Sequence, residues 1–308
     1  MIVCVGEILA DMIGAERDGA FFYERKAGGA PFNVACAAKK FGAQVAFVGS
    51  VGDDTIGRYL AEFARSRDLD ATEIKTCEAA NTTLAFVEIA DDGERSFCFY
   101  RKNTADIRLP DVSTELLSRA SIVHIGSLML SEKSGAKYAL ELCRRAHKAG
   151  KRVSFDVNFR SDIFRDEAAA VTAYKKLLAE ADIVKFSEDE LKIFTQGYVD
   201  GLAESKLVCI SLGGAGSRWL YRGNGRSVPS ISVKPVDTTG AGDAFFAGVL
   251  VGLDALKEPY EGDALDGIFA FANACGALNT LGRGAIDCLP ELDEVRGAAR
   301  SIVKGGTV

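Results

Sequence analysis

The chain has 308 residues, of which 48% are hydrophobic and 26% are charged, so it can bury a large core as an ordinary globular protein. Its formal net charge of -6 and the lack of any clustered run of Lys and Arg argue against nucleic acid as the main partner, because counterion release needs clustered cations. The 8 Cys residues are scattered without the close pairing of a zinc site, and we expect them to be buried thiols.

The first residues, 1–7, have no basic leader and reach an acid at Glu7, unlike a secretory signal. The least charged stretches, 244–253 and 267–282, are too short or too interrupted by Asn to span a bilayer. Together with the free thiols, these features predict a cytoplasmic protein with no membrane partner.

Short apolar runs alternate with amphipathic segments along the chain. The apolar runs predict buried parallel strands at 2–5, 45–48, 122–125, 153–155, 183–186 and 208–212. Apolar residues at helical spacing predict helices over 55–67, 133–149 and 167–180. This alternation predicts an α/β fold with a doubly wound, mostly parallel sheet, helices on both faces, and ligands beyond the carboxyl ends of the strands.

One region departs from that alternation. Residues 84–89 and 96–100 are typical of two strands, and Asp-Asp-Gly-Glu at 91–94 is typical of a hairpin turn between them. With the extended, aromatic segment 20–26, they predict a small separate sheet. Such a sheet acts either as a lid that excludes water from group transfer or only as an oligomer contact.

The most informative run is Asp-Thr-Thr-Gly-Ala-Gly-Asp at 237–243, between an extended stretch at 231–236 and an apolar helix from 244 onward. The first N–H groups of a helix have no intrahelical partner and favour an anion, and glycines let the backbone approach phosphate oxygens. Asp243 would repel a static phosphate but can accept a proton from an attacking hydroxyl. The run therefore indicates phosphoryl transfer, with dipole complementation at a tight turn as the structural alternative.

Two better-known nucleotide motifs are missing. The sequence has no Gly-x-x-x-x-Gly-Lys-Ser/Thr and no complete Gly-x-Gly-x-x-Gly that opens a helix. P-loop and dinucleotide enzymes are therefore disfavoured.

The run at 237–248 resembles the carboxyl-terminal signature of the PfkB (ribokinase-like) carbohydrate kinases. Ala-Gly-Gly-Ala-Pro-Phe-Asn-Val-Ala at 27–35, continued by 41–54, resembles the amino-terminal glycine motif of that family. With Gly-Glu-Ile-Leu-Ala-Asp at 6–11, the resemblance spans nearly the whole chain. It implies one ribokinase-like kinase domain over 1–308, with a lid sheet from about 12–32 and 81–106.

The resemblance also implies roles for the residues that match these motifs. Asp243 matches the catalytic base, and the anion hole matches Gly240, Ala241 and Gly242. The positions that hold the sugar match Asp11, Gly28, Gly29 and Asn33, beside Asp243 itself. The alternative for the upstream glycines is a flexible strand-to-helix turn.

Asp-Val-Asn-Phe-Arg at 156–160 resembles a family segment near substrate and phosphates. Arg160 can neutralise the transferring charge or clamp an anionic substrate, and an ion pair with a neighbouring acid is the alternative.

Ser-Glu-Asp-Glu at 187–190 stands where the family has Asn-x-x-Glu, whose acid organises magnesium and its waters. The resemblance implies that Glu190 holds Mg²⁺ through water, whereas a helix capping box is the alternative for Ser187 and Glu190. Positions that match the ATP side are Ser187, Ser211, Gly213, Gly216, Gly240, Gly242 and Asn273. Asp237 and Thr239, with backbone at 283–285, match the region where relatives hold a monovalent cation, and potassium binding is left open.

The segment 97–106, with Arg101 after an aromatic pair, is similar to the fructokinase branch. We therefore expect transfer of the γ-phosphoryl group of ATP to fructose, giving fructose 6-phosphate. Arg101 beside Arg160 could instead grip a carboxylate, so 2-keto-3-deoxygluconate kinase and other sugar or nucleoside kinases of the family stay open. A catalytically silent regulator that binds sugar or nucleotide is a further alternative. A homodimer formed through the lid sheet also stays open.

Overall fold

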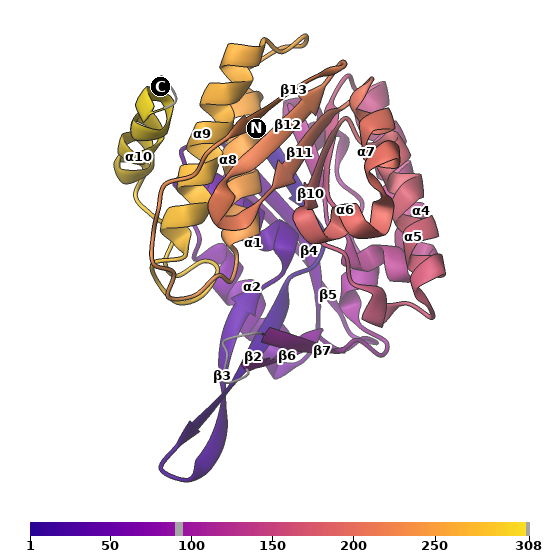
Figure 1. The fold of residues 1–308 in the computed structure, drawn as a ribbon. Coiled ribbons are helices and arrows are strands. Elements are labelled where there is room, and N and C mark those ends of the chain that lie inside the picture. The colour runs from indigo at the N-terminus through magenta and orange to yellow at the C-terminus, as the bar shows by residue number, and fades with distance from the viewer. Residues whose placement is uncertain (90–94, 306–308) are drawn as a thin grey trace.

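The computed structural model of the chain describes residues 1–89 and 95–305 and contains a large and a small β-sheet (Figure 1). From one edge to the other, the strands of the large sheet are β13 (Asn224–Val228), β12 (Ser217–Tyr221), β11 (Leu207–Ser211), β10 (Ile183–Ser187), β9 (Arg152–Asp156), β8 (Ile122–Ile125), β1 (Ile2–Val5), β4 (Val45–Gly52) and β5 (Ala71–Cys77). Neighbouring strands from β11 to β5 are parallel, and β12 and β13 form an antiparallel edge. The predicted mostly parallel sheet is confirmed.

The central strands are buried along their whole length and mostly apolar because both of their faces are covered. Every residue of β1, β4 and β8 is buried, which explains why these strands appear in the sequence as continuous apolar runs. All six predicted strands of the sheet are present. β4 runs on to Gly52 because its pairing with β5, which was not predicted, continues that far.

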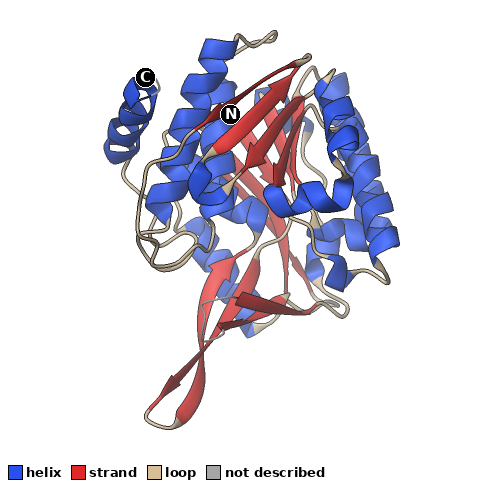
Figure 2. Ribbon diagram, viewed as in Figure 1, coloured by secondary structure: helices blue, strands red, loops and turns tan. Residues whose placement is uncertain are grey.

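Helices cover both faces of the large sheet (Figure 2). One hydrophobic core lies under α1 (Ala30–Lys40), α2 (Thr55–Arg65), α8 (Ala241–Asp254), α9 (Gly262–Asn279) and α10 (Leu292–Gly305). A second core lies under α3 (Thr114–Arg119), α4 (Lys133–Lys148), α5 (Glu167–Glu180), α6 (Glu188–Phe194) and α7 (Gln196–Ala203). The doubly wound arrangement is therefore confirmed. The helices predicted over 55–67, 133–149 and 167–180 are α2, α4 and α5, with ends shifted by at most two residues. The helix predicted from 244 onward is α8, which begins earlier, at Ala241.

The segment 231–236, expected to be extended, belongs to no strand of the described chain. Pro235 has no N–H to donate, and the N–H of Val236 bonds instead to the carbonyl of Thr280 after α9, at 2.7 Å. The segment therefore runs from β13 to α8 without joining the sheet.

The small sheet has the strand order β3-β2-β6-β7 and projects from one end of the molecule (Figure 1). Its strands are β3 (Ala20–Gly28), β2 (Leu9–Arg17), β6 (Leu84–Ile89) and β7 (Arg95–Tyr100). The two strands predicted over 84–89 and 96–100 pair antiparallel, whereas the turn predicted at 91–94 lies outside the described residues. β2 was missed, although it forms the hairpin that brings β3 back to α1.

The direction of winding reverses at β1. The chain builds β4 on one side of β1 and returns much later to build β8 on its other side. Where the chain connections after two adjacent parallel strands run to opposite sides, a crevice is left beyond the carboxyl ends of these strands, and α/β proteins bind ligands there.

The eight thiols are all free, but they are not all buried. The expectation is wrong at Cys98, which is exposed on β7, and at Cys288, which is partly exposed. No helix in the described parts of the chain has the length and apolar character needed to cross a membrane.

Candidate active site

A cavity of about 590 Å³ lies where the crevice of the large sheet faces the small sheet. It draws side chains from the ends of β1, β9 and β10, from β2 and β7, and from the starts of α1 and α8. Its lining residues are Glu7, Leu9, Asp11, Gly29, Ala30, Asn33, Phe99, Leu128, Asp156, Asn158, Arg160, Lys185, Thr238, Thr239, Gly240, Gly242 and Asp243. Most residues predicted for the base, the anion hole and the sugar therefore meet in one place.

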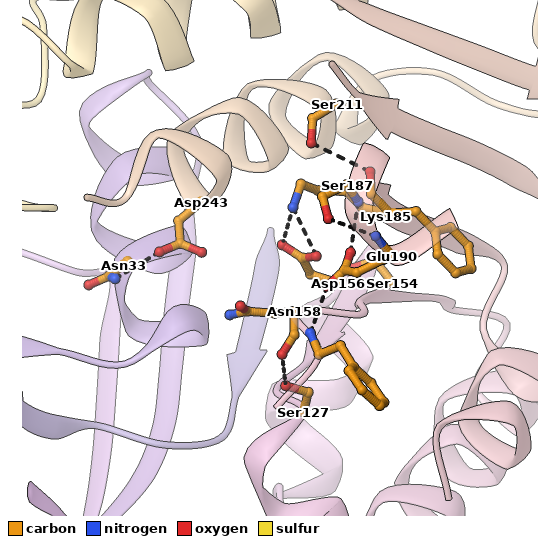
Figure 3. Close-up of polar contacts among 12 residues, drawn as sticks. Asn33, Ser127, Ser154, Asp156, Asn158, Lys185, Ser187, Glu190, Ser211 and Asp243 are labelled. Carbon is orange, nitrogen blue, oxygen red and sulfur yellow. Dashed lines mark hydrogen bonds and ion pairs between the residues drawn. The ribbon is translucent and has the colours of Figure 1, made fainter. Parts of the chain in front are cut away.

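Asp243 lies in the first turn of α8 and receives a hydrogen bond from Nδ2 of Asn33, 2.8 Å from its Oδ2 (Figure 3). Burial raises the pKa of Asp243, while the Asn33 hydrogen bond and the charges of Lys185 and Arg160 oppose this rise. The carboxylate is thus oriented from α1 and has one oxygen left for another partner.

The start of α8 depends on Gly240. This residue has a left-handed backbone (φ 73°), and a Cβ there would lie 2.5 Å from Cβ of Ala285. Because the helix begins at Ala241, its first N–H groups lack intrahelical acceptors and lie at the cavity, although that of Ala241 approaches the Thr238 carbonyl at 3.2 Å. The turn can therefore bind an anion beside Asp243.

The upstream glycines, predicted to lie on the sugar side, shape the cavity in different ways. A Cβ on Gly28 would lie 2.1 Å from Oδ2 of Asp11, so only glycine leaves this carboxylate in place. Gly29 has φ 111°, and a Cβ there would lie 2.5 Å from the Glu7 carbonyl oxygen. Gly28 makes room for Asp11, whereas Gly29 lines the cavity itself.

Lys185, which sequence analysis did not single out, forms a buried ion pair beneath α8. Its Nζ lies 2.8 and 3.0 Å from the two oxygens of Asp156, and a Cβ on Gly242 would lie 3.4 Å from it (Figure 3). Burial alone would lower the pKa of Lys185. The nearby carboxylates, above all Asp156, outweigh this effect, so the pKa of Lys185 is raised. Burial raises the pKa of Asp156 to about 6 against the attraction of Lys185, so both groups are charged at neutral pH.

Arg160 and Asn158 follow β9 and line the same cavity. Asn158 has a left-handed backbone (φ 39°), and its carbonyl oxygen accepts a hydrogen bond from Oγ of Ser127 at 3.4 Å. This turn directs the chain after β9 along the cavity wall. The cavity thus contains two cations, Arg160 and Lys185.

Arg101 does not line this cavity. Its guanidinium forms an ion pair with buried Asp106 and donates to Oγ of Ser131 at 2.7 Å and to the carbonyl of Leu128 at 3.1 Å. It faces a neighbouring cavity of about 800 Å³ instead. The nearby aromatic residue that does line the site is Phe99.

A second cavity, of about 430 Å³, adjoins the first at Thr238 and Gly242, which line both. Its walls include apolar side chains of 231–235 and α8, together with five of the seven residues predicted for the ATP side: Ser211, Gly213, Gly216, Gly242 and Asn273. Gly240 lines only the first cavity. Asn273 is held in place because its Nδ2 donates to the carbonyls of Val228 (2.9 Å) and Pro229 (3.0 Å). The first turn of α8 is therefore the wall that the two cavities share.

Ser187 and Glu190 line neither cavity, and the capping box suggested for them is present. Glu190 accepts from the N–H of Ser187 at 2.7 Å and from the N–H of Phe159 at 2.6 Å (Figure 3). Its carboxylate thus fastens the chain after β9 to the start of α6.

Asp237 is buried in the loop before α8, and its carboxylate organises that loop. Oδ1 accepts from the N–H and the hydroxyl of Thr239, at 2.8 and 2.7 Å, and Oδ2 accepts from the N–H of Gly284 at 2.9 Å. The loop that contains Gly284 also supplies Ala285, which packs on Gly240.

Sequence and structure comparisons find relatives along the whole chain. The family described as pfkB family carbohydrate kinase matches residues 1–292. The probable fructokinase-7 of Arabidopsis thaliana is 36% identical, covering 96% of this chain and 91% of the relative. A fructokinase from Xylella fastidiosa with bound ATP superposes with a TM-score of 0.89 at 31% identity, covering 97% of this chain and 98% of that one. A Vibrio cholerae fructokinase with bound fructose, ADP and calcium gives a TM-score of 0.85 at 27% identity, with coverage of 97% and 98%.

The Lys185–Asp156 pair predicts a stability effect that is independent of activity. Lys185→Ala leaves the Asp156 carboxylate buried without its partner, and we expect it to lower the free energy of unfolding by about 3–5 kcal/mol in urea titrations. The double variant Lys185→Met with Asp156→Asn removes both charges and should recover most of that loss. Arg144→Ala, which breaks an exposed pair with Glu141, is the control and should cost less than about 1 kcal/mol. Equal free energies of unfolding for Lys185→Ala and wild type would refute the energetic coupling between Lys185 and Asp156.

Proposed function

The chain belongs to the pfkB family of carbohydrate kinases, and from this we propose that it transfers the γ-phosphoryl group of ATP to the 6-hydroxyl of fructose. The observation that carries the proposal is the first turn of α8. It separates a polar cavity lined by Asp11, Asn33 and Asp243 from a more apolar cavity next to the glycine loop 213–216. A sugar on one side and ATP on the other would meet at Gly242, beside a carboxylate base.

The reaction needs one proton transfer and one displacement. Asp243 takes the proton of the primary hydroxyl as that oxygen attacks the γ-phosphorus; the bond from phosphorus to the bridging oxygen of ADP breaks, and ADP leaves with this oxygen. Asn33 holds one oxygen of the carboxylate, and Asp243 lines the cavity where the hydroxyl would bind. The proton remains on Asp243 until the products leave.

The charge on the transferring phosphoryl group is stabilised by groups already in place. These are the N–H groups at the start of α8, the Nζ of Lys185 directly below, and the guanidinium of Arg160. Because the Asp156 pair fixes Lys185, little reorganisation is needed during transfer.

Magnesium fits this site only as a hydrated ion. In the described parts of the chain, no cluster of three or more acidic, His or Cys side chains is arranged to hold a metal, and both oxygens of Glu190 already accept backbone N–H groups. Their remaining lone pairs can bind the water shell of an ion that sits on the phosphates. When bound, Mg²⁺ neutralises phosphate charge.

The structure favours a neutral sugar over an acidic one. The pair of guanidinium groups suggested for a sugar carboxylate is not formed in the cavity, because Arg101 is neutralised by Asp106 and lies outside it. Arg160 alone lines the cavity, where it is assigned to the phosphoryl group. The remaining groups, Asp11, Asn33 and the backbone at Gly29, are suited to hydroxyls. The small sheet, which brings Asp11 and Phe99 to the cavity, serves as its lid.

The direct test is a coupled ADP-release assay over a panel of sugars with Asp243→Asn alongside wild type. Fructose should be the best acceptor, and the variant should lose at least about a hundredfold in kcat, the usual contribution of a general base. Asp68→Asn, at an exposed position whose left-handed backbone (φ 53°) suits Asn, is the matched control and should keep wild-type turnover. Preference for 2-keto-3-deoxygluconate would refute fructose. Sugar binding without ADP release would point to a silent regulator, and an active Asp243→Asn enzyme would refute the base.

A monovalent cation is proposed for the loop around Asp237, whose buried carboxylate positions the start of α8 through Gly284 and Ala285. Potassium should raise turnover several-fold over tetramethylammonium at equal ionic strength, and Asp237→Asn should abolish the difference. The control is Asp68→Asn, which should respond to potassium like wild type. Equal wild-type rates in both salts would refute the cation.

A homodimer is proposed in which two copies of the chain pair through their small sheets. The face away from the cavity exposes Phe21 (61%), Tyr23 (41%) and Tyr100 (62%), and Phe86 joins the rings of Tyr23 and Tyr100 with centroid distances of 4.9 and 5.1 Å. Light scattering should give twice the chain mass, and Phe21→Ser with Tyr100→Ser should halve it. Val303→Ser on α10, also exposed (58%), should leave the mass unchanged. A monomeric wild type would refute the pairing.

A further inference from the structure

Glu7 is a buried acid at the centre of the molecule. It follows β1 and is 1% exposed, at the crevice between the ends of β1 and β8. A Cβ on Gly126, just after β8, would lie 2.5 Å from its Oε2 and 2.9 Å from Cγ of Pro31 in α1. The carboxyl therefore occupies a narrow slot that exists because Gly126 has no side chain.

Neither oxygen of this carboxyl has a hydrogen-bond partner in the described parts of the chain. An ionised carboxylate without partners is far more costly to bury than a neutral acid. Burial raises the pKa of Glu7 to about 8. The nearby backbone N–H of Glu7 itself opposes this rise most and Arg101 opposes it further, whereas Asp106 and Asp243 reinforce it.

The charged groups that face Glu7 come from three elements. Asp243 belongs to α8, Asp106 to the 3-10 turn Ala105–Ile107, and Arg101 to the chain after β7. The other elements packed against the carboxyl contribute uncharged residues, Pro31 from α1 and Gly126 after β8. Since Arg101 is already paired with Asp106, an ionised Glu7 would add an uncompensated negative charge beside Asp243.

Such a charge would act against the proposed reaction. The cavity wall already contains three carboxylates, those of Asp11, Asp156 and Asp243, against the cations Arg160 and Lys185. The phosphoryl group brings further negative charge to the same place. A neutral Glu7 keeps the balance that phosphoryl transfer needs.

We propose that Glu7 is a positioning residue that works in its protonated form, and that its ionisation sets the alkaline limit of phosphoryl transfer by acting on Asp243 and the transferring group. This inference rests on the proposed function. It assigns Glu7 no contact with the reacting atoms. Its role is electrostatic and is exerted through its neighbours.

The first experiment compares the pH profiles of kcat/KM and kcat for wild type and Glu7→Gln, an uncharged side chain of nearly the same shape. Wild type should show an alkaline limb with a midpoint at about 8, and in Glu7→Gln this midpoint should rise by roughly one pH unit or more or disappear. The acid limb from Asp243 should be present in both. Glu204→Gln, at an exposed acid after α7, is the control and should keep the wild-type profile. An unchanged alkaline limb in Glu7→Gln would overturn the inference.

The second experiment does not depend on activity. Folding raises the pKa of Glu7 from 4.5 to about 8. The protonated carboxyl therefore contributes its full stabilisation of the fold below pH 4.5, and this contribution is lost as the pH rises through about 8. Relative to Glu7→Gln, wild type should therefore lose stability in urea unfolding across this window. If the free energies of unfolding of wild type and Glu7→Gln changed with pH in parallel, the inference would be overturned even if no sugar were phosphorylated.

Infrared spectroscopy tests the wild-type protein directly, whether or not the variant folds. At neutral pH, wild type should show a protonated carboxyl band that shifts on labelling with ¹³C-glutamate and disappears by about pH 9. Absence of that band would overturn the inference. Fructose phosphorylation with no such band would leave the proposed function intact and reject only the role of Glu7.

Discussion

The rest of the site depends on the turn at which α8 begins. Gly240 adopts a left-handed backbone and packs on Ala285, so the helix starts at a fixed point between two cavities. That point places Asp243 on one side and the apolar wall of the second cavity on the other. A residue with a side chain at 240 would push away the loop that Asp237 organises, and the proposed base, the proposed anion hole and the wall of the second cavity would move together.

Buried charge around this turn is arranged in pairs or kept neutral. Lys185 is held by Asp156, and Arg101 by Asp106, so each buried cation has its own carboxylate. Asp243 has the amide of Asn33 and remains available to a substrate proton. The carboxyl oxygens of Glu7 have no hydrogen-bond partner in the described residues, and in our proposal Glu7 satisfies the same rule by holding a proton. The cavity can thus accept a highly charged nucleotide without a large excess of its own charge.

The small sheet supplies what the large sheet cannot. The strands of the large sheet end at the crevice and face the ligand from one side only, whereas β2 and β7 bring Asp11 and Phe99 from the opposite side. Gly28 contributes to this arrangement, because its missing side chain leaves room for Asp11. The aromatic residues on the other face of this sheet are exposed, and this is the surface through which we propose that a second copy of the chain pairs.

The parallel strands, four of the helices and the glycine turns could be predicted from the amino-acid sequence, because apolar periodicity and glycine conformation are local properties. Three ordered motifs in the sequence also pointed to Asp243, Asn33 and Asp11. Only the tertiary structure showed that Arg101 is bound to Asp106, that Lys185 lies under α8, that Glu190 caps a helix, and that β2 completes the small sheet. These features depend on which segments far apart in the chain become neighbours: Lys185 appeared in the sequence as one charged residue in an apolar strand, and its partner comes from another strand. Pairing, burial and the protonation of Glu7 are properties of such neighbourhoods, so the residue types alone could not reveal them.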